Sequence, residues 1–341
     1  MDKTYLRQAI GIDIGSKKLQ CRHGVLDSQM KIHLKASKSI SNHYGEFDQL
    51  QQWIERHSGK YSGVKLIFII EATGTYHEEL LYFLTDHGYS VCVTLPKSTR
   101  HFAKSLNTKT KNDRVDAGVL ARMGLERELT PWQAPSDQMK TLKDLTRELE
   151  QLKKDRTRLL NQLHAKQKAY HVHEEIIERL KSRIAFIDEQ IKLVETQIEE
   201  IISNSPDLQE PIDRIEKVQG LGRMTIISII AETDGFALFK SIKQLSSYVG
   251  LDVVERQSGD FRGKTRISKA GNRRIRASLY FPAISASIHN PTLSKFYHRL
   301  LNKGKAKKLA LTAVARKLLG IIYSLWKSGQ EYQKDLNIKS L

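Results

Sequence analysis

Short apolar runs separated by polar turns occupy the first 95 residues of the chain. Helices are predicted over 44–57 and 76–87, where apolar residues recur every three or four positions. Strands are predicted over five apolar runs, at 9–15, 19–26, 31–36, 65–70 and 90–95. The strand–helix–strand order from 65 to 95 is typical of a parallel crossover. The N-terminal third is therefore predicted to be an α/β domain.

The middle of the chain predicts two long helices, because 137–203 contains neither proline nor glycine. Leucines from Leu142 to Leu163 and aliphatic residues from Ile177 to Ile201 recur at alternating spacings of three and four, as in heptad seams. The polar stretch 165–175 could reverse the chain into an antiparallel hairpin, or straight helices could pack on a second subunit. Two amphipathic helices of a monomeric bundle would give the same pattern. We favour dimerisation, because a strict heptad stripe is narrow and needs a matching helix.

The last third predicts further helices, over 225–231, 241–249 and 305–327. A Gly220-Leu221-Gly222 turn precedes the first of them, as in a helix-hairpin-helix, where backbone N–H groups can approach a phosphate. A tight structural connection would give the same turn. The predicted organisation is an α/β domain over 1–130, a coiled-coil dimerisation region over 131–204, a helical domain over 205–330 and a tail over 331–341.

The charge of the chain indicates which kind of partner it binds. The formal net charge is +18. Between Arg256 and Lys327, 17 Lys and Arg residues face one acid, Asp260, so this stretch alone carries +16. A tract with so little negative charge would repel itself. It therefore predicts a polyanionic partner, for which nucleic acid is the first candidate. No apolar run suggests a membrane span, and two cysteines without a metal-binding pattern indicate a reducing cytoplasm.

Four acids in the N-terminal third are candidates for metal-dependent chemistry. Asp13 lies within an apolar run, and Glu71 ends another. Asp113 and Asp116 are three residues apart, which places them on one face of a helix starting near Asn112. If the two strands are neighbours, the four carboxylates could hold two Mg²⁺ ions about 4 Å apart for attack on a phosphodiester. A solvated helix start and a solvated strand-end acid are the alternatives for these residues.

Three motifs around these acids resemble those of a known family. Gly11-Ile12-Asp13, the hexapeptide 71–76 (Glu-Ala-Thr-Gly-Thr-Tyr) and the stretch 112–117 (Asn-Asp-Arg-Val-Asp-Ala) resemble the DEDD motifs of IS110-type insertion-sequence transposases and Piv-like DNA invertases. The resemblance implies a RuvC-like, RNase H-like N-terminal domain with Mg²⁺, or Mn²⁺, at Asp13, Glu71, Asp113 and Asp116. Asn112 departs from the threonine that is frequent there.

The resemblance continues in the basic tract, over 254–259 and 268–272. It implies that Ser258 is the nucleophile that forms a phosphoserine link to DNA, whereas without context Ser258 before Gly259 is a turn residue. It also implies a structured guide RNA, an oligomer (dimer or tetramer), and carboxylates and serine brought together across subunits. DNA would comprise the element ends and the target. Residues predicted to contact nucleic acid are Gly220, Gly222, Arg223, Arg256, Arg262, Lys264, Arg266, Lys269, Arg273, Arg274 and Arg276.

Two other classes of protein fit the residue pattern. A RuvC-like nuclease or junction resolvase would hydrolyse DNA with metal and water, leaving Ser258 structural. A non-enzymatic nucleic-acid-binding scaffold would carry the acids without using them. The three classes differ in whether DNA is cleaved and whether it becomes covalently attached to the protein.

Overall fold

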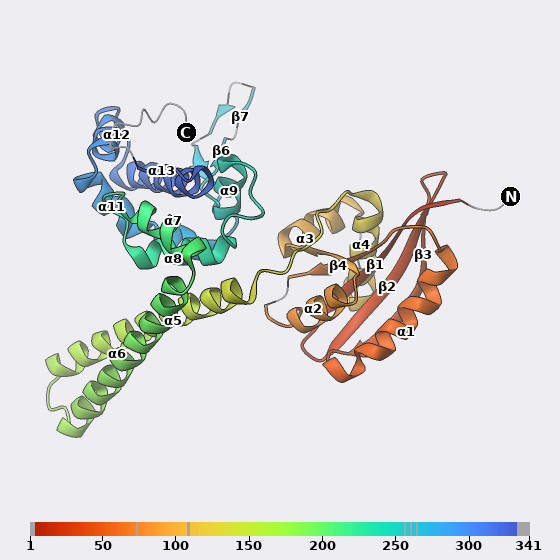
Figure 1. Cartoon of the computed structure of the whole chain (residues 1–341), viewed down its shortest axis with the longest axis horizontal. Helices are drawn as coiled ribbons and strands as arrows, with labels where there is room; N and C mark the ends of the chain where they lie inside the picture. Colours follow the sequence, from red (N-terminus) through yellow and green to blue (C-terminus); the bar gives the residue numbers. More distant parts are fainter. Residues whose placement is uncertain are drawn as a thin grey trace. The chain divides into compact units, whose positions relative to one another are not determined.

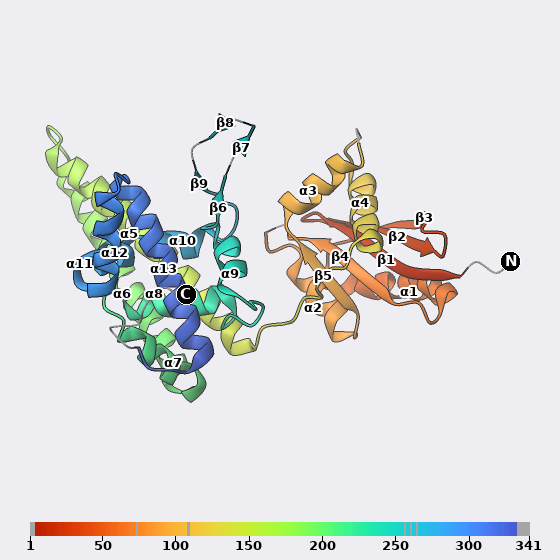
Figure 2. The same ribbon diagram turned by 90° about the horizontal axis from the view of Figure 1, so that it is seen from above.

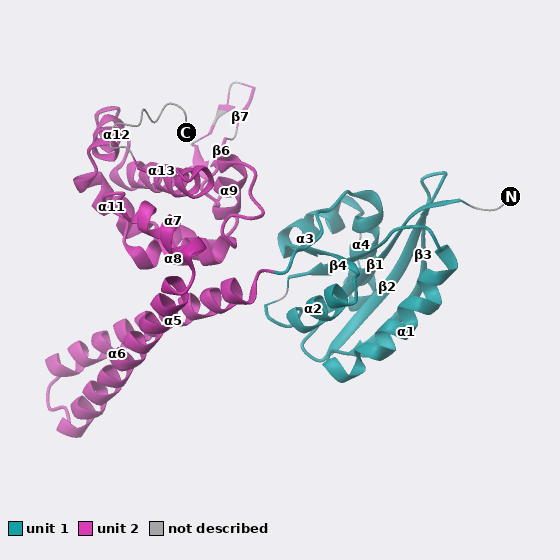
Figure 3. Ribbon diagram, in the orientation of Figure 1, with its two compact units in different colours: residues 1–134 teal, residues 135–341 magenta. Residues whose placement is uncertain are grey.

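The computed structural model describes residues 4–72, 74–107, 110–255, 257–259, 261–263 and 265–332, with Arg262 as backbone only. The chain forms two compact units, 1–134 and 135–341 (Figure 3). Each unit has its own hydrophobic core. The predicted coiled-coil region 131–204 is not a unit of its own: Leu142 and Leu149 of its first helix belong to the same core as the C-terminal helices.

Unit 1 is a five-stranded mixed sheet with helices on both faces (Figures 1 and 2). Its strands are β1 (Tyr5–Ile14), β2 (Lys18–Asp27), β3 (Ile32–Ser41), β4 (Leu66–Glu71) and β5 (Ser90–Thr94). Its helices are α1 (Phe47–Ser58), α2 (Glu78–Asp86), α3 (Pro96–Ser105) and α4 (Asp113–Glu126), with short 3₁₀ turns at Tyr44–Glu46 and Gly59–Tyr61. The strand order is β3-β2-β1-β4-β5, antiparallel among the first three and parallel from β1 to β5. The mixed sheet fits the expected RNase H-like domain.

The alternation of side chains along β1 divides its residues between two cores. Ile10, Ile12 and Ile14 are buried among residues of α1 and α2. Ala9 lies on the opposite face, with Leu120 of α4. Asp13 is an even number of positions after Ala9 on the strand, so its side chain is on the same face as that of Ala9, the α4 face of the sheet.

Two glycines allow α4 to lie directly on the strands. A Cβ atom at Gly11 of β1 would be 2.2 Å from both the carbonyl oxygen of Ala117 and the amide nitrogen of Ala121. A Cβ atom at Gly124 of α4 would be 2.1 Å from Cδ1 of Ile69 on β4. Real Cβ atoms do not come that close, so the backbone of α4 sits at a distance from the sheet that only glycine permits.

We expect Gly11→Ala to lower the free energy of unfolding of unit 1 by about 1–3 kcal/mol, because the new methyl group must push α4 off the sheet. Gly59→Ala is the matched control, since Gly59 is helical, with φ −58°, and a Cβ atom there meets nothing within 4 Å. Denaturant unfolding of the full chain measures both. Equal stability of the two variants would contradict the close contact.

Unit 2 is mostly helical. Its helices are α5 (Asp137–Lys168), α6 (Glu174–Ser203), α7 (Pro206–Glu216), α8 (Arg223–Thr233), α9 (Ile242–Val249), α10 (Arg273–Ser278), α11 (Tyr280–His289), α12 (Pro291–Asn302) and α13 (Lys307–Ser328). Four two-residue strands lie between α9 and α10: β6 (Val253–Val254), β7 (Gln257–Ser258), β8 (Phe261–Arg262) and β9 (Arg266–Ile267). β6 pairs with β9 and β7 with β8, which makes a hairpin that projects from the helices (Figure 1).

α5 and α6 form an antiparallel helical hairpin, which is one of the alternatives that the sequence left open for this region. Ion pairs join Arg156 to Asp188 and Lys153 to Glu195, the second over 2.8 Å. The end of the hairpin has a small core of its own around Leu159, with Leu180 and Ile184. The other end packs into the core of unit 2.

α13 corrects one expectation from the sequence. Among the described residues it is the single helix long and apolar enough to cross a membrane by length and composition, although no such run was expected. Half of its most apolar window is buried inside the protein. Val314, Leu318 and Ile322 are fully buried among the other helices, which is the environment of a core helix.

Candidate functional site

Asp13 and Glu71 lie on neighbouring strands, which meets the condition that the sequence analysis set for their convergence. β1 pairs with β4 in parallel, and Ile12 is opposite Ile70, so the next residues of the two strands are at the same level. Both point to the α4 face, because Ile12 and Ile70 are buried in the core on the other face. Both acids are half-buried.

α4 begins at Asp113, where the sequence predicted a helix start. The side-chain oxygen of Asn112 accepts a hydrogen bond from Val115 N over 2.9 Å and so caps the helix. Asp113 and Asp116 are both in the first turn. The contact of Ala117 with Gly11 fixes this turn against β1, two residues before Asp13.

Asp13 interacts electrostatically with each of the other three acids. The pKa of Asp13 is raised from 3.8 to about 6, first by burial and then by the negative charges of Asp116, Asp113 and Glu71. A hydrogen bond from the backbone of Ile14 only partly offsets this. At neutral pH the site therefore concentrates negative charge that a cation would neutralise.

A cavity of about 370 Å³ opens on Asp13, Glu71 and Asp116. Its other walls come from α3, the segment before α4 and the next turns of α4, including three basic residues: Arg100, Lys104 and Lys111. Basic side chains beside an acidic cluster suit a ligand that is itself anionic and binds through a cation, such as a phosphodiester.

The donor set fits a hard divalent cation, because carboxylate oxygens are the ligands that Mg²⁺ and Mn²⁺ prefer. In the part of the chain that the structure describes, no three His, Cys, Asp or Glu side chains are close enough together to enclose a metal ion. The carboxylates would therefore have to draw together around the ion. Their mutual repulsion at Asp13 is the strain that such binding would relieve.

Asn42, which no sequence pattern singles out, joins the two loops that follow the acidic strand ends. Its side-chain amide donates to the carbonyl oxygens of Gly15 and Tyr76, over 2.9 and 3.0 Å. Gly15 follows β1, and Tyr76 ends the hexapeptide that begins at Glu71. Asn42 thus holds the loop after Asp13 to the loop after Glu71.

We expect Asn42→Ala to slow metal-dependent DNA cleavage about tenfold, because looser loops let the two strand-end acids drift apart. Gln8→Ala is the control: the Gln8 amide also bridges a strand to a loop, donating to Val64 O over 2.7 Å, but at the other end of β1. Single-turnover rates of DNA cleavage by the two variants are compared at a temperature well below their melting temperatures. Equal slowing by both variants would mean general destabilisation.

Ser258 lies at the far end of the β6–β9 hairpin of unit 2. It is exposed, and its partner in the β7–β8 pair, Phe261, is 64% exposed. Gly259 follows it with φ +55°, as a turn requires. The hydroxyl is therefore accessible at the end of a narrow arm.

The predicted nucleic-acid contacts divide into free and engaged side chains. Arg266, Lys269 and Arg273 are exposed. Arg274 is ion-paired with Glu150, and Arg276 donates to Val249 O over 2.6 Å. Arg256, Lys264 and the side chain of Arg262 lie outside the described residues.

The Gly-Leu-Gly turn lies between α7 and α8, but two of its predicted contacts are used inside the protein. Gly220 has φ +98°, and a Cβ atom there would be 2.6 Å from the backbone of Ala286, so it is needed for packing on α11. Gly222 caps α8, and a Cβ atom there meets nothing within 4 Å. The guanidinium of Arg223 is held by three carboxylates at 2.5–3.0 Å, those of Glu199, Asp213 and Glu216.

Comparison with known proteins gives this arrangement a family. Residues 10–172 match the model of the DEDD transposases of IS110 type, and residues 212–298 match that of the IS116/IS110/IS902 transposase family. The pilin gene-inverting proteins of Moraxella bovis and Moraxella lacunata are each 30% identical over 99% of this chain and 100% of their own. The transposase of insertion sequence IS1111A from Coxiella burnetii is 24% identical over 70% of this chain and 71% of its own. RuvC of Thermus thermophilus aligns with 37% of this chain and 99% of its own, at 11% identity and a TM-score of 0.29.

These matches define the class first: the chain is one of the transposases and related gene-inverting proteins, which recombine DNA enzymatically. Within that class it belongs to the IS110 family. The predicted family is confirmed.

Proposed function

We propose that the protein is a DNA transposase or site-specific recombinase that cuts and rejoins strands through a phosphoserine intermediate. The four carboxylates of unit 1 hold Mg²⁺ or Mn²⁺, and Ser258 of unit 2 is the nucleophile. A structured RNA guides the choice of DNA. The observation that carries the proposal is the convergence of Asp13 and Glu71 with the acidic first turn of α4, seen in the raised pKa of Asp13.

The carboxylates supply ligands, and a bound divalent ion would stabilise negative charge on the reacting phosphate. Arg100, Lys104 and Lys111 would contact the flanking phosphates from the walls of the cavity. α4 is held against β1 by the contact at Gly11, so the first turn of α4 stays beside the strand that carries Asp13.

In the covalent step, the Ser258 oxygen forms a bond to the scissile phosphorus while the bond from phosphorus to the leaving nucleoside oxygen breaks. The hydroxyl proton is lost, and the leaving oxygen gains a proton. The phosphodiester becomes a phosphoserine ester, so its bond energy is retained for rejoining. A hydroxyl is a weak nucleophile, and the excess of Lys and Arg over acids in the basic tract would favour its ionised form.

The proposal of an oligomer through the α5–α6 hairpin is supported by apolar side chains that remain exposed on it. Phe186 and Leu193 of α6 are 61% and 51% exposed. They are seven residues apart, so they lie on one face of the helix, and such a stripe suits a helix of a second subunit. We propose that serine and carboxylates from different subunits complete one reaction site.

DNA and RNA binding would use the exposed basic residues of the tract, with Arg273 among them, and the N-terminus of α8 at Gly222. The three carboxylates around Arg223 leave the turn less positive than its sequence suggests. Phosphate contacts of a helix-hairpin-helix would here rest on the backbone of Gly222.

Incubation with end-labelled DNA of the element ends, Mg²⁺ and RNA transcribed from the flanking sequence tests the proposal. Denaturing gels should show labelled DNA attached to protein, and the attachment should need both Mg²⁺ and RNA. Cleavage without attachment would identify a hydrolytic nuclease instead. Binding without cleavage would identify a scaffold.

A further inference from the structure

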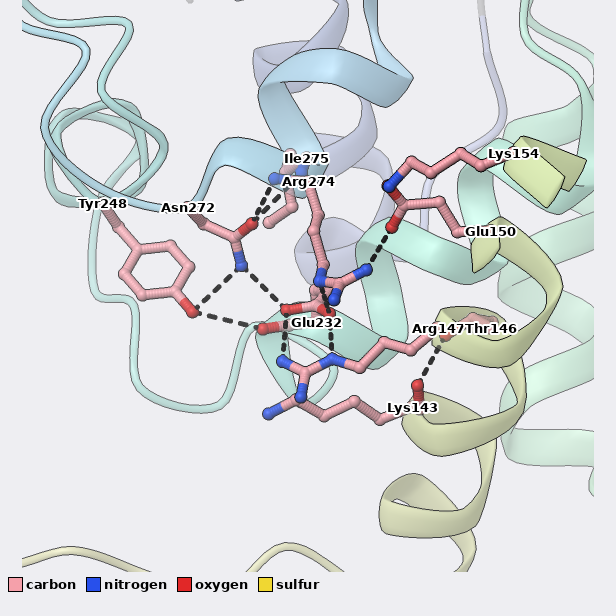
Figure 4. Close-up of polar contacts among 10 residues, drawn as sticks. All are labelled: Lys143, Thr146, Arg147, Glu150, Lys154, Glu232, Tyr248, Asn272, Arg274 and Ile275. Atoms are coloured by element: carbon pink, nitrogen blue, oxygen red, sulfur yellow. Dashed lines mark hydrogen bonds and ion pairs between the residues drawn. The ribbon is translucent and has the colours of Figure 1, made fainter. Parts of the chain in front are cut away.

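We propose that Asn272 is a positioning residue: together with Glu232 and Arg147 it sets the direction of the arm that carries Ser258. The inference rests on the proposed function only where it concerns catalysis. The geometry that supports it lies within unit 2 (Figure 4).

The centre of the arrangement is a buried carboxylate. The side chain of Glu232 on α8 is 5% exposed. Arg147 of α5 donates to its two oxygens over 2.6 and 3.2 Å, and Asn272 donates to one of them over 2.8 Å. Burial raises the pKa of Glu232, but the hydrogen bonds from Arg147 and Asn272 outweigh it, so the net shift is downward and the carboxylate stays ionised.

Asn272 connects this carboxylate of α8 to two other elements, α9 and α10. Its side-chain oxygen accepts hydrogen bonds from the amides of Arg274 and Ile275 and caps α10. The backbone N–H of Asn272 donates to the carbonyl oxygen of Tyr248 on α9 over 2.7 Å. The side-chain amide is also 3.4 Å from the Tyr248 hydroxyl. Asn272 therefore ties α8, α9 and α10 at one point.

That point is the base of the arm. The chain enters the arm after Gly250 and leaves it before Asn272, and Lys269 N donates to Gly250 O over 3.1 Å. Ser268 bonds to Asp252 through both backbone and side chain. A Cβ atom at Gly271 would be 2.0 Å from Tyr248 O, so the returning strand is pressed against the end of α9.

Beyond this base the described residues of the arm are joined by two-residue strand pairs. The direction of the arm is therefore fixed where it joins the helices, and Arg147 extends the control to α5, the long helix of the proposed oligomer contact. Small rotations at Asn272 would move Ser258 by much larger distances, because Ser258 is at the far end.

The test replaces the Asn272 amide while keeping the helix cap. In Asn272→Ser the hydroxyl can still cap α10, but it is too short to reach Glu232. Asn290→Ser is the matched control, because Asn290 also caps a helix (α12) and also donates to a second group, the Tyr332 hydroxyl, over 2.9 Å. It lies outside the network around Glu232.

The readout is a distance. Ser258→Cys combined with Glu148→Cys gives two exposed sites for spin labels, on the arm and on α5. The native Cys21 and Cys92 are buried, and burial raises the pKa of Cys21 to about 12, so neither competes for the label. Full-length labelled protein is diluted with unlabelled protein, so that pulsed electron–electron double resonance reports distances within one chain.

We expect a narrow distribution that becomes at least about twofold wider in Asn272→Ser and is unchanged in Asn290→Ser. In the protein with Ser258 present, Asn272→Ser should slow DNA attachment about tenfold or more with DNA affinity unchanged. An unchanged distribution in folded Asn272→Ser, or equal widening by both variants, would overturn the inference. Attachment that persists in Ser258→Ala would instead overturn the proposed function, while the distances would still decide whether Asn272 directs the arm.

Discussion

Replacement of Asp13 by asparagine should reduce metal-dependent DNA cleavage at least about 10³-fold while making unit 1 more stable in the absence of metal. Activity is lost because a central ligand between β4 and α4 disappears. Stability is gained because burial, and then the charges of three nearby acids, disfavour the ionised form of Asp13 and raise its pKa to about 6. The full shift would correspond to about 3 kcal/mol, and since Asp13 is only half-buried, solvent screening leaves about 1 kcal/mol.

The destabilisation of unit 1 by the charge of Asp13 should depend on pH. The folded-state pKa of Asp13 is above its ordinary value, so its destabilising charge is fully present above about pH 6 and is lost as the pH falls through 6 towards 4. Burial lowers the pKa of His23 to about 4, and this works in the opposite direction over the same range. The difference in melting temperature between the parent and Asp13→Asn isolates Asp13: it should be largest at neutral pH and shrink on acidification.

Mg²⁺ provides a second check on the same variant. It should raise the melting temperature of the parent, because a ligand that binds the folded state stabilises it, and it should do so less in Asp13→Asn. An Asp13→Asn protein that is less stable than the parent and equally stabilised by Mg²⁺ would place the metal elsewhere.

Ser258→Ala should abolish covalent attachment of DNA, a loss of about 10³-fold or more, with DNA affinity within about twofold of the parent. The serine is exposed at the end of the arm, so its replacement should leave the fold of unit 2 unaffected. Gel shifts measure binding, and denaturing gels measure attachment.

Thr265→Ala is the control for Ser258→Ala, because Thr265 offers another exposed hydroxyl on the same arm. It should attach DNA at the parental rate. If Ser258→Ala still forms the adduct, the nucleophile is another residue. If Ser258→Ala cleaves DNA without attachment, the carboxylates alone support hydrolysis.

The sheet and its acids could be predicted because burial leaves a clear pattern. β1 and β4 are nearly continuous apolar runs, and an acid within or at the end of such a run stands out. The neighbouring position of the two strands was a condition of the prediction, since sequence periodicity does not specify strand order. The pairing of Ile12 with Ile70 in the structure shows that the two strands are neighbours.

Other parts had weaker signals. α3 is a polar helix that buries only Thr99 and Phe102, so its pattern was too sparse to predict. The strands of the arm are two residues long, which is too short for any alternation to be seen.

Long-range partners were the hardest to foresee. Arg223 was expected to meet phosphate, but carboxylates from α6 and α7 hold it. Glu232 did leave a signal, an acid in a helix that is apolar all round, which means that a buried partner must exist. Its partners, Arg147 and Asn272, are 85 and 40 residues away in the chain.

The glycine contact between α4 and the sheet predicts how tolerance to substitution would differ between two saturation libraries. In a library selected only for soluble expression, Gly11 and Gly124 should reject nearly every side chain, whereas Asp13 should accept many. In a library selected for movement of DNA, all three positions should be depleted. Subtracting one profile from the other would separate architecture from chemistry residue by residue, without prior assumptions about which acids bind metal.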